Sequence, residues 1–432
     1  MKLLNDKGGR FNGYKKAILL GAGDRGGRVY ANLIKSLSHK IKLIGVAEPV
    51  KERRERVSSH HNLDERYVQE SWKALLDLKP EADIAIICTQ DKAHFEPTMK
   101  ALDLGYHVLL EKPMSPSPEE CIKMVEKAKE MDRTLTICHV LRYTPFWSRI
   151  KSIVQNGDIG QIASIQLNEN VEYMHMSHSF VRGNWKSKEQ SSPMILAKSC
   201  HDMDIISYIM DQDCKRINSF GSLMYFNEAN KPEGAPLRCL DGCPAENECP
   251  FHAGRYYLGI GRGWAMKFTE ENSNEAIIER LNHTDYGKCV FQSDNDVVDH
   301  QVVNMEFENG ATATFSMSAF TREQTRIVQI MGTKGEIRGN METNEISIFD
   351  FLTREEKVIK FPEVSSGHGG GDEGIIRDFI DAINSSDKNV SKSIASKSLI
   401  SHLMAFAAEE SRLNHGQSIN IDEFYNEIAL TS

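Results

Sequence analysis

The chain has 432 residues, of which 40% are apolar and 26% are charged, and its formal net charge is −9. This composition is typical of globular proteins, and at this length more than one domain is expected. The acidic balance argues against a basic face that would bind nucleic acid or an anionic membrane surface.

The cellular compartment is indicated by the termini and the cysteines. No apolar run approaches the roughly 18 residues that a membrane span needs, and residues 1–14 lack the apolar core of a secretory signal. The nine cysteines are odd in number, and several lie inside apolar runs where a thiol behaves as a small hydrophobe. We therefore predict a cytoplasmic protein in a reducing compartment.

In the first third of the chain, short apolar segments alternate with segments of helical period. The predicted strands cover residues 16–20, 41–47, 84–88, 107–110 and 135–138, and the predicted helices cover residues 28–37, 51–59, 94–104 and 118–131. Short apolar strands separated by helices are typical of a parallel sheet covered on both faces. Residues 13–142 are therefore predicted to form a doubly wound α/β domain of the Rossmann type.

After about Tyr143 the pattern changes to longer, partly alternating strands. These are predicted over residues 162–173, 216–226, 303–307, 311–317 and 327–331, and helices follow at residues 375–383 and 397–408. Asn309-Gly310 supplies the positive φ angles of a tight hairpin turn, and Gly332-Thr-Lys-Gly335 marks a second turn. We predict an α+β domain over residues 143–432 with an open, mainly antiparallel sheet and a cysteine-rich insertion around residues 230–260.

A glycine-rich loop follows the first strand and opens the first helix. Its glycines, Gly21, Gly23 and Gly26, allow a tight turn and bring the backbone close to a pyrophosphate at the unpaired amides of a helix N-terminus. Asp24 and Arg25 lie within the same loop. The strand–loop–helix context predicts that all five residues contact a dinucleotide.

An acidic residue lies where a dinucleotide-binding domain needs one. Glu48 ends the second strand, 22 residues after Gly26. A carboxylate there accepts hydrogen bonds from the ribose hydroxyls and repels a 2′-phosphate, which favours NAD over NADP. Arg53 and Arg54 follow closely and could neutralise such a phosphate, so NADP stays open.

Five further motifs carry a family resemblance. They are Glu111-Lys112-Pro113, Arg142-Tyr143-Thr-Pro145, Gly157-Asp-Ile159-Gly160, Asn184-Trp185-Lys186 and Cys200-His201-Asp202-Met-Asp204. In order and spacing the chain resembles the Gfo/Idh/MocA family, which includes glucose–fructose oxidoreductase and inositol dehydrogenase. The resemblance implies a Rossmann domain, an open-faced sheet domain, a tightly held nicotinamide cofactor, a sugar or cyclitol substrate, and dimers or tetramers built through the sheet.

The resemblance also implies catalytic residues. Lys112 takes the place of the family's active-site lysine, and His201 takes the place of its catalytic histidine. Oxidation of a carbinol carbon requires a base that takes the hydroxyl proton, and histidine titrates in the right range. Lys112 can polarise the developing oxyanion or act as the base itself. The family often has an Asp four residues before the histidine, but this chain has Ala197 there, with Lys198 beside it.

Four residues complete the predicted cofactor contacts. Thr89 and His94 follow the strand at residues 84–88, and Glu111 and Lys112 follow the strand at residues 107–110. Strand ends on this edge of a doubly wound sheet are where its ligands bind.

The insertion concentrates cysteines. Cys239, Cys243 and Cys249 lie within eleven residues, and thiolates this close together in a reducing compartment suit a structural zinc ion. The fourth ligand could be His252, Cys200 or water. The alternative is a proline-rich insertion with free thiols, and both interpretations stay open.

Two other segments contain histidines. Ser366-Gly-His368-Gly-Gly-Gly-Asp372 precedes the helix near Ile375, so Asp372 could be its N-cap, or the glycine-rich loop could face the substrate. His175 and His178 lie in a Met-rich segment, and we assign them no role.

The sequence predicts an NAD(P)-dependent dehydrogenase that acts on a sugar, sugar acid or cyclitol, with Lys112 and His201 as its acid–base pair. One alternative is a redox-neutral NAD-dependent glycoside hydrolase. The Gly-Asp-Arg-Gly loop and the missing Asp before His201 are similar to features of such enzymes in this family. A second alternative is a non-catalytic NAD-sensing regulator, which would not need the Lys112–His201 pair.

Overall fold

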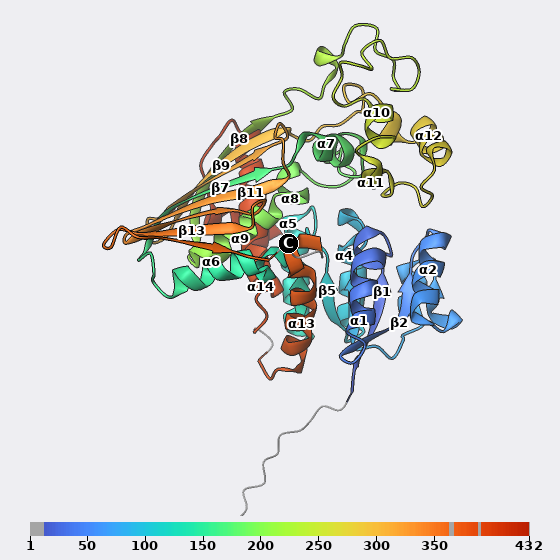
Figure 1. Cartoon of the computed structure of the whole chain (residues 1–432). Helices are drawn as coiled ribbons and strands as arrows, with labels where there is room; N and C mark the ends of the chain where they lie inside the picture. The colour runs from blue at the N-terminus through green and yellow to red at the C-terminus, as the bar shows by residue number, and fades with distance from the viewer. Residues whose placement is uncertain (1–12, 363–366, 388–389, 432) are drawn as a thin grey trace, which may run out of the picture.

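The first sheet of the computed structural model has six parallel strands in the order β3-β2-β1-β4-β5-β6 (Figure 1). They are β1 Lys15–Leu20, β2 Ile41–Ala47, β3 Val68–Gln69, β4 Ile84–Ile87, β5 His107–Leu110 and β6 Leu135–Ile137. The structure describes residues 13–362, 367–387 and 390–431. The strand order reverses between β1 and β4, and doubly wound sheets bind ligands at the carboxyl ends of the strands at such a point. The predicted Rossmann-type domain is confirmed.

Helices connect these strands, and all the α-helices among them except α3 are predicted from the sequence. They are η1 Asp24–Tyr30, α1 Ala31–Ser36, α2 Lys51–His61, α3 Trp72–Asp77, α4 Phe95–Asp103 and α5 Pro118–Glu130, with short 3₁₀ turns η2 Glu65–Tyr67, η3 Asp91–Ala93 and η4 Val140–Tyr143. Helix α5 begins at residue 118 because Pro118 suits the first helical position and the Ser117 side chain accepts from the Glu120 amide. The first helix begins at Asp24, four residues before its predicted start, in wide π-type turns.

The second sheet has nine strands in the order β14-β13-β12-β11-β7-β10-β9-β8-β15 within the described residues. They are β7 Ile162–Asn170, β8 Cys214–Ser222, β9 His300–Phe307, β10 Thr312–Ser318, β11 Thr325–Gly332, β12 Gly335–Asn340, β13 Glu345–Asp350, β14 Glu356–Lys360 and β15 Ile419–Asn420. Strands β7 and β10 run parallel and the other neighbours run antiparallel. This confirms the predicted mainly antiparallel sheet.

The predicted hairpin and turns determine where these strands end. Asn309-Gly310 joins β9 to β10, with Gly310 at φ +82°. The predicted strand over residues 162–173 ends earlier, because Tyr173 begins the short helix α7 Tyr173–Met176. The predicted strand over 216–226 likewise ends at Ser222.

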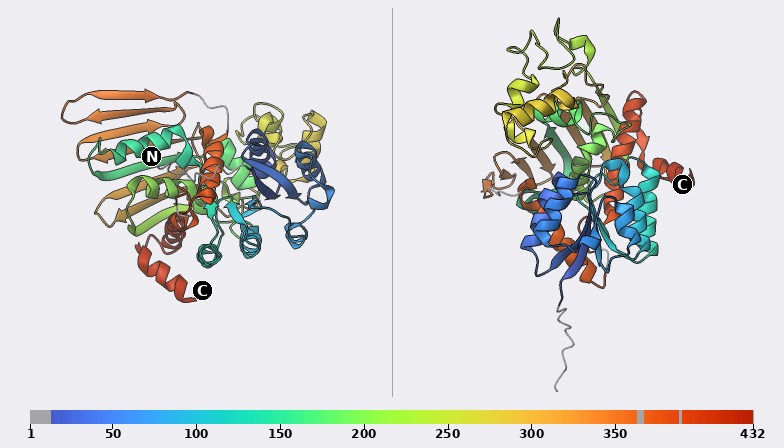
Figure 2. Two further views of the ribbon diagram at one scale, coloured as in Figure 1. Left: turned by 90° about the horizontal axis from the view of Figure 1, so that it is seen from below. Right: turned by 90° about the vertical axis from the view of Figure 1, so that its right-hand side faces the viewer.

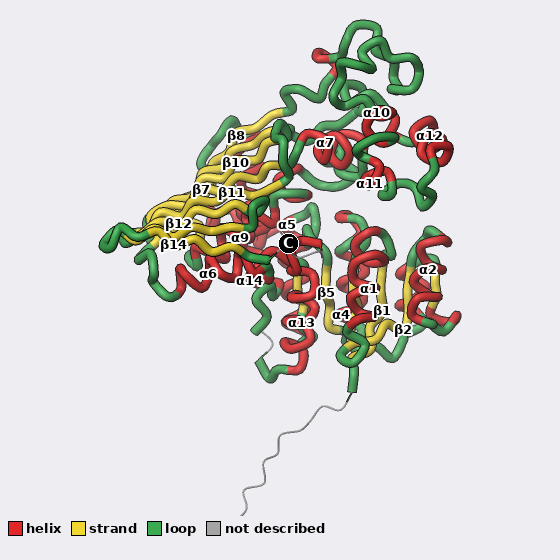
Figure 3. The backbone as a smooth tube through the Cα atoms, in the orientation of Figure 1, coloured by secondary structure: helices red, strands yellow, loops and turns green. Residues whose placement is uncertain are grey.

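Helices cover one face of the second sheet and leave the other face open. Figures 2 and 3 show α6 Pro145–Gln155, α9 Cys200–Met210 and α14 Ala395–Leu413 on the covered side. Along β9 and β10 buried and exposed residues alternate, so the open face is largely polar. It also carries a few exposed apolar side chains, such as Phe220, Val302 and Ile327.

The remaining elements link the two sheets. They are η5 Ser177–Arg182, α8 Met194–Ala197, η8 Gly367–Gly370, α13 Gly371–Asn384 and α15 Ile421–Thr431. Helix α13 packs Ile376 and Phe379 into the same apolar core as Leu19 and Ile86 of the first sheet. The predicted boundary at residue 142 therefore separates the strands, but this C-terminal helix returns to the first domain.

The segment between β8 and β9 is the predicted insertion, and it is longer than residues 230–260. It contains η6 Glu228–Asn230, α10 Ala253–Tyr257, α11 Arg262–Ala265, α12 Asn274–His283 and η7 Asp285–Gly287. In Figure 1 its helices lie above the first domain. The described part of the chain contains no helix with the length and apolar character that a membrane crossing requires.

Candidate active site

The glycine-rich loop folds tightly between β1 and the first helical turn. A Cβ atom on Gly21 would lie 2.5 Å from the carbonyl oxygen of Cys88, and one on Gly26 would lie 2.0 Å from the carbonyl oxygen of Gly21. These two positions therefore require glycine for packing. Gly23 differs, because a Cβ atom there would meet only Arg53 Nη1, at 4.0 Å. The space beside Gly23 is open, and an open backbone at a helix N-terminus is where such loops hold the pyrophosphate of a dinucleotide.

Glu48 lies at the rim of this loop, as the spacing predicts. Its carboxylate is buried and accepts from the Ala22 amide at 2.7 Å and from the Val50 amide at 3.0 Å. Each oxygen keeps a further lone pair for a ribose hydroxyl. Arg54 is directed elsewhere, toward the Glu48 carbonyl and the Glu70 carboxylate, which leaves Arg53 as the cation beside the loop.

The Arg25 side chain is engaged within the protein. Its guanidinium donates to Glu111 Oε1 at 2.7 Å, to Asp372 Oδ1 at 2.6 Å and to the Tyr30 hydroxyl at 2.9 Å. Burial alone would raise the pKa of Glu111, but the Arg25 guanidinium beside it holds this pKa below its usual value. This ion pair positions the loop, and the contacts of Arg25 and Glu111 with a cofactor stay a prediction.

Thr89 and His94 form a turn after β4. The half-buried Thr89 hydroxyl donates to the Ala93 carbonyl at 2.8 Å. The buried His94 ring has Nδ1 2.7 Å from the Pro113 carbonyl oxygen and Nε2 3.1 Å from the Thr89 carbonyl oxygen. Both ring nitrogens thus face backbone carbonyls, so His94 holds the Lys112-Pro113 turn in place. The contacts of Thr89 and His94 with a cofactor stay a prediction.

Lys112 extends from the end of β5 into the second domain. Its Nζ atom donates to the carbonyl oxygen of Ala197, at the end of α8, at 2.7 Å. Where the family often has an Asp at position 197, a backbone carbonyl thus accepts from the lysine here. An ammonium has three donors, so two remain for a ligand.

His201 lies in the first turn of α9, four residues after Ala197. Its ring is buried, and Nδ1 has no hydrogen-bond partner among the residues that the structure describes. Burial, then the positive charge of Lys112, then His139 lower the pKa of His201 well below 6.5. The imidazole is therefore neutral at pH 7 and able to accept a proton. The structure thus brings the two predicted catalytic residues together from different domains.

A buried polar group behind His201 was not assigned from the sequence. The His139 ring lies 5.8 Å from the His201 ring, and its Nε2 is 3.6 Å from Asp204 Oδ1. Arg142 binds the same carboxylate at 2.7 and 2.6 Å. Arg142 and Asp204 stand in two of the recognised motifs, which was a usable signal, but His139 follows a strand with no pattern around it.

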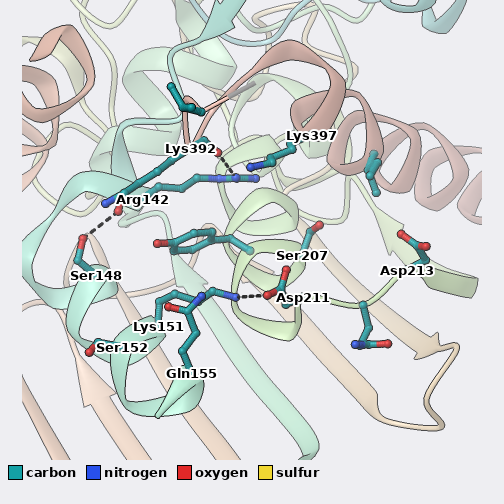
Figure 4. Close-up of a pocket in the computed structure, with 14 residues that line it drawn as sticks. Arg142, Ser148, Lys151, Ser152, Gln155, Ser207, Asp211, Asp213, Lys392 and Lys397 are labelled. Atoms are coloured by element: carbon teal, nitrogen blue, oxygen red, sulfur yellow. Dashed lines mark hydrogen bonds and ion pairs between the residues drawn. The ribbon is translucent and has the colours of Figure 1, made fainter. Parts of the chain in front are cut away.

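Arg142 also lines a cavity on its other side (Figure 4). Lys151, which pairs with Asp211 at 3.1 Å, and Lys392 lie in the same cavity. Neither Lys112 nor His201 is among the lining residues. The candidate active site is therefore the Lys112–His201 junction, with Arg142 separating it from this cavity.

The second lysine near the histidine is already paired. Lys198 Nζ lies 3.1 Å from Glu169 Oε1, and Arg326 binds both Glu169, at 2.7 Å, and Asp202, at 2.6 Å. Burial lowers the pKa of Lys198. This network holds the start of α9 on the sheet, and Lys112 remains the lysine directed at the site.

The glycine-rich loop before α13 also reaches the site. The ring of His368 lies 6.0 Å from that of His201, and its Nδ1 is 3.3 Å from Asp372 Oδ2. Asp372 pairs with Arg25, while the N-cap of α13 is Gly370, so the N-cap interpretation of Asp372 is wrong. Ser366 lies outside the described residues. That the loop faces the substrate stays a prediction.

The cysteines of the insertion share one small cavity, which Cys289 also lines. The His252 ring nitrogens lie 2.8 Å from the Cys239 carbonyl oxygen and 3.3 Å from the Arg255 amide nitrogen, and Cys200 is not among the residues that line this cavity. Among the described residues, no three His, Cys, Asp or Glu side chains are arranged to hold a metal ion. The structure therefore adds no support for zinc at Cys239, Cys243 and Cys249.

Comparisons with known proteins identify the two domains. Residues 15–139 match the Gfo/Idh/MocA "oxidoreductase family, NAD-binding Rossmann fold", and residues 151–420 match its "C-terminal alpha/beta domain". YteT of Bacillus subtilis, named as an oxidoreductase, is 25% identical over 68% of this chain and 71% of its own length. The NAD⁺-dependent scyllo-inositol 2-dehydrogenase of Bacillus subtilis is 25% identical over 48% of this chain and 58% of its own length.

Solved structures have the same fold. Levoglucosan dehydrogenase, in complex with NADH and levoglucosan, superposes with a TM-score of 0.71. The match covers 95% of this chain and 100% of that chain, at 16% identity. At this identity the likeness shows the fold alone.

Proposed function

Because the chain belongs to the Gfo/Idh/MocA family of NAD-binding oxidoreductases, we propose that it is a dehydrogenase for a hydroxyl group of a sugar, sugar acid or cyclitol. The observation that carries this proposal is the meeting of Lys112 with His201 at the junction of the two domains. The glycine-rich loop and Glu48 on the same sheet edge fit a dinucleotide, and the nicotinamide would supply the hydride acceptor when bound.

The chemistry follows from the protonation states of the two side chains. Neutral His201 takes the proton from the substrate hydroxyl as the carbonyl forms. The two free donors of the Lys112 ammonium stabilise the negative charge that develops on the oxygen. The bond from Lys112 Nζ to the Ala197 carbonyl fixes the ammonium close to His201.

The substrate class is supported by relatives and by the polar character of the site. The Bacillus subtilis relative is named for scyllo-inositol, and the structural neighbour holds levoglucosan. Both are ring compounds with several hydroxyl groups. These relatives are dehydrogenases, so neither a glycoside hydrolase nor an NAD-sensing regulator gains support.

One experiment tests the function. The purified chain is incubated with NAD⁺ and a panel of free sugars, sugar acids, inositols and glycosides in deuterated water, while NADH formation and deuterium entry are followed. Net NADH formation with at least one polyol is expected. Glycoside cleavage with deuterium entry and no net NADH would contradict the proposal in favour of a hydrolase. Bound NAD without any turnover would favour a regulator.

Glu48 is expected to determine the preference for NAD over NADP. Replacing it by Gln keeps the shape and the hydrogen bond from the Ala22 amide but removes the charge that repels a 2′-phosphate. We expect the ratio of NADP to NAD dissociation constants to fall by roughly tenfold or more, the usual weight of a charged hydrogen bond. Titration calorimetry measures both constants. Glu55→Gln, an exposed carboxylate that pairs with Lys51, is the matched control, and equal shifts in the two variants would contradict the role of Glu48.

The assembly and compartment remain parts of the proposal. We infer a homodimer or homotetramer built through the open face of the second sheet, where Phe220, Val302 and Ile327 are exposed. All nine cysteines are described and free of disulfides, which supports a reducing, cytoplasmic environment.

A further inference from the structure

Residues 266–273, between α11 and α12, cross from the insertion to the first domain; we call this segment the strap. In Figure 1 it descends from α11 and α12 toward α1 and α2. It belongs to no motif noted in the sequence, and its contacts with the first domain are made by charged side chains.

The strap is bonded to the first domain at two places. Lys267 Nζ lies 2.7 Å from Asp24 Oδ2, in the glycine-rich loop. Glu270 Oε2 lies 2.9 Å from Arg28 Nη2 and 2.9 Å from Arg56 Nη1. Arg28 also donates to the Met266 carbonyl at 3.0 Å. The strap therefore bridges the helix that follows β1 and helix α2, which follows β2.

On its other side the strap is anchored in the insertion by aromatic packing. Phe268 is buried and stacks on Tyr286 with ring centroids 4.4 Å apart. Just before the strap, Trp264 lies 4.8 Å from the ring of His178, which is held by the Tyr257 hydroxyl at 2.8 Å. His178 thus supports the base of the strap.

The two bonded places bracket the site expected to bind the dinucleotide. Asp24 lies next to Gly23, beside which the backbone is open, and helix α2 begins three residues after Glu48. The pyrophosphate is expected at the first position and the adenosine ribose at the second. A segment bonded to both elements at once lies across the route by which that half of a dinucleotide would leave.

We propose that the strap encloses the pyrophosphate and adenosine end of the bound cofactor. Lys267 is a cofactor-positioning residue, and the ion pairs of Glu270 with the first domain keep the strap closed. This inference rests on the proposed NAD-binding function. It implies that the reduced cofactor is released slowly.

Charge balance explains the choice of Lys267. A pyrophosphate bound at Gly23 brings negative charge close to the Asp24 carboxylate, and like charges repel. The Lys267 ammonium neutralises Asp24, so the phosphates meet no net negative charge there. The side chains of Asp24 and Lys267 are 45% and 39% exposed, so the pair can open without leaving a buried charge behind.

The test measures how fast the cofactor leaves the full-length protein. The chain is loaded with NADH, excess NAD⁺ is added, and the loss of bound-NADH fluorescence gives the dissociation rate constant. Glu270→Gln removes two partly exposed ion pairs, so this constant is expected to rise roughly 2- to 30-fold. Added salt is expected to accelerate release from the unaltered protein and to have little effect on the variant.

Glu271→Gln is the matched control, because the Glu271 carboxylate bonds within the strap to the Ser273 hydroxyl at 2.8 Å. It is expected to release NADH at the unaltered rate. Lys267→Met is expected to weaken NADH binding, and to weaken it less when Asp24→Asn is also present. If the Glu270 and Glu271 variants both bind NADH and release it at equal rates, the proposed role of the strap is wrong and the proposed NAD binding is not affected. A chain that binds no NADH at all would instead overturn the proposed function.

Discussion

Lys112→Met is expected to lower kcat/KM by roughly 10³-fold, the scale on which a preorganised donor to a developing oxyanion contributes, while NADH binding stays within about twofold. The methionine side chain preserves the length of the stem but removes the ammonium and its bond to the Ala197 carbonyl. Catalysis loses the charge that stabilises the oxygen, whereas the glycine-rich loop and Glu48 are untouched. Initial rates with the best substrate and a fluorescence titration with NADH measure the two quantities separately.

Two further variants make this result specific. Lys92 is exposed in the turn after β4, so Lys92→Met removes a nearby positive charge without touching the site and should leave kcat/KM unchanged. Lys112→Arg keeps a cation but replaces a compact ammonium by a planar fork, so it should restore only a small part of the rate. A Lys112→Met variant with normal turnover would remove Lys112 from the proposed mechanism.

The fold could be predicted wherever the signal was local. Asn309-Gly310 marked the hairpin, because the turn type and the alternation on each side depend on neighbouring residues only. Strand β3 and helix α3 were not predicted, since β3 has two residues and its pairing with β2 is visible only in three dimensions. The return of α13 to the first sheet was equally hidden. It depends on the packing of the apolar face of α13 against the first sheet, whose strands lie more than 200 residues earlier in the chain.

The candidate site, like the fold, could be predicted only in part. Glu48 and Lys112 stand in motifs at the ends of β2 and β5, on the carboxyl edge of the first sheet. His201 stands in a motif of helix α9 and approaches Lys112 from the second domain. Arg25 and Glu111 also stand in motifs, but they lie 86 positions apart in the chain. Only the structure shows that their charges pair with each other. A motif therefore indicates that a residue lies near the site, but not whether its side chain is free.

Burial explains why the polar group that contains His139 was not predicted from the sequence. His139 is fully buried beside Asp204, and Arg142 neutralises that carboxylate from the other side. A single histidine after a strand does not indicate such a group in the sequence. The backbone carbonyl of Ala197 accepts the bond from Lys112, but any residue would offer that carbonyl, so the structure does not explain the replacement of the family's Asp.

His201→Gln is expected to lower kcat/KM by roughly 10²-fold or more, the usual contribution of a general base, and to change its pH dependence. Burial and the charge of Lys112 lower the pKa of His201 below 6.5. The base is neutral above its pKa and is lost as the pH falls through it, so in the unaltered enzyme the acidic limb of kcat/KM should lie below pH 6.5. Rates measured across the pH range should show this limb in the unaltered enzyme and not in the variant.

The stability of the folded chain should also fall as the pH falls, which provides a second measurement. A histidine whose pKa is lower in the folded state than in the unfolded state binds fewer protons when folded, so stability falls as the pH drops below the unfolded value. His201 and His402, the latter with a pKa of about 3, both act in this direction. The Tm should therefore fall from pH 7 to pH 5, and less steeply in His201→Gln. Identical Tm slopes, or an acidic limb that persists in the variant, would show that His201 is not the group that titrates.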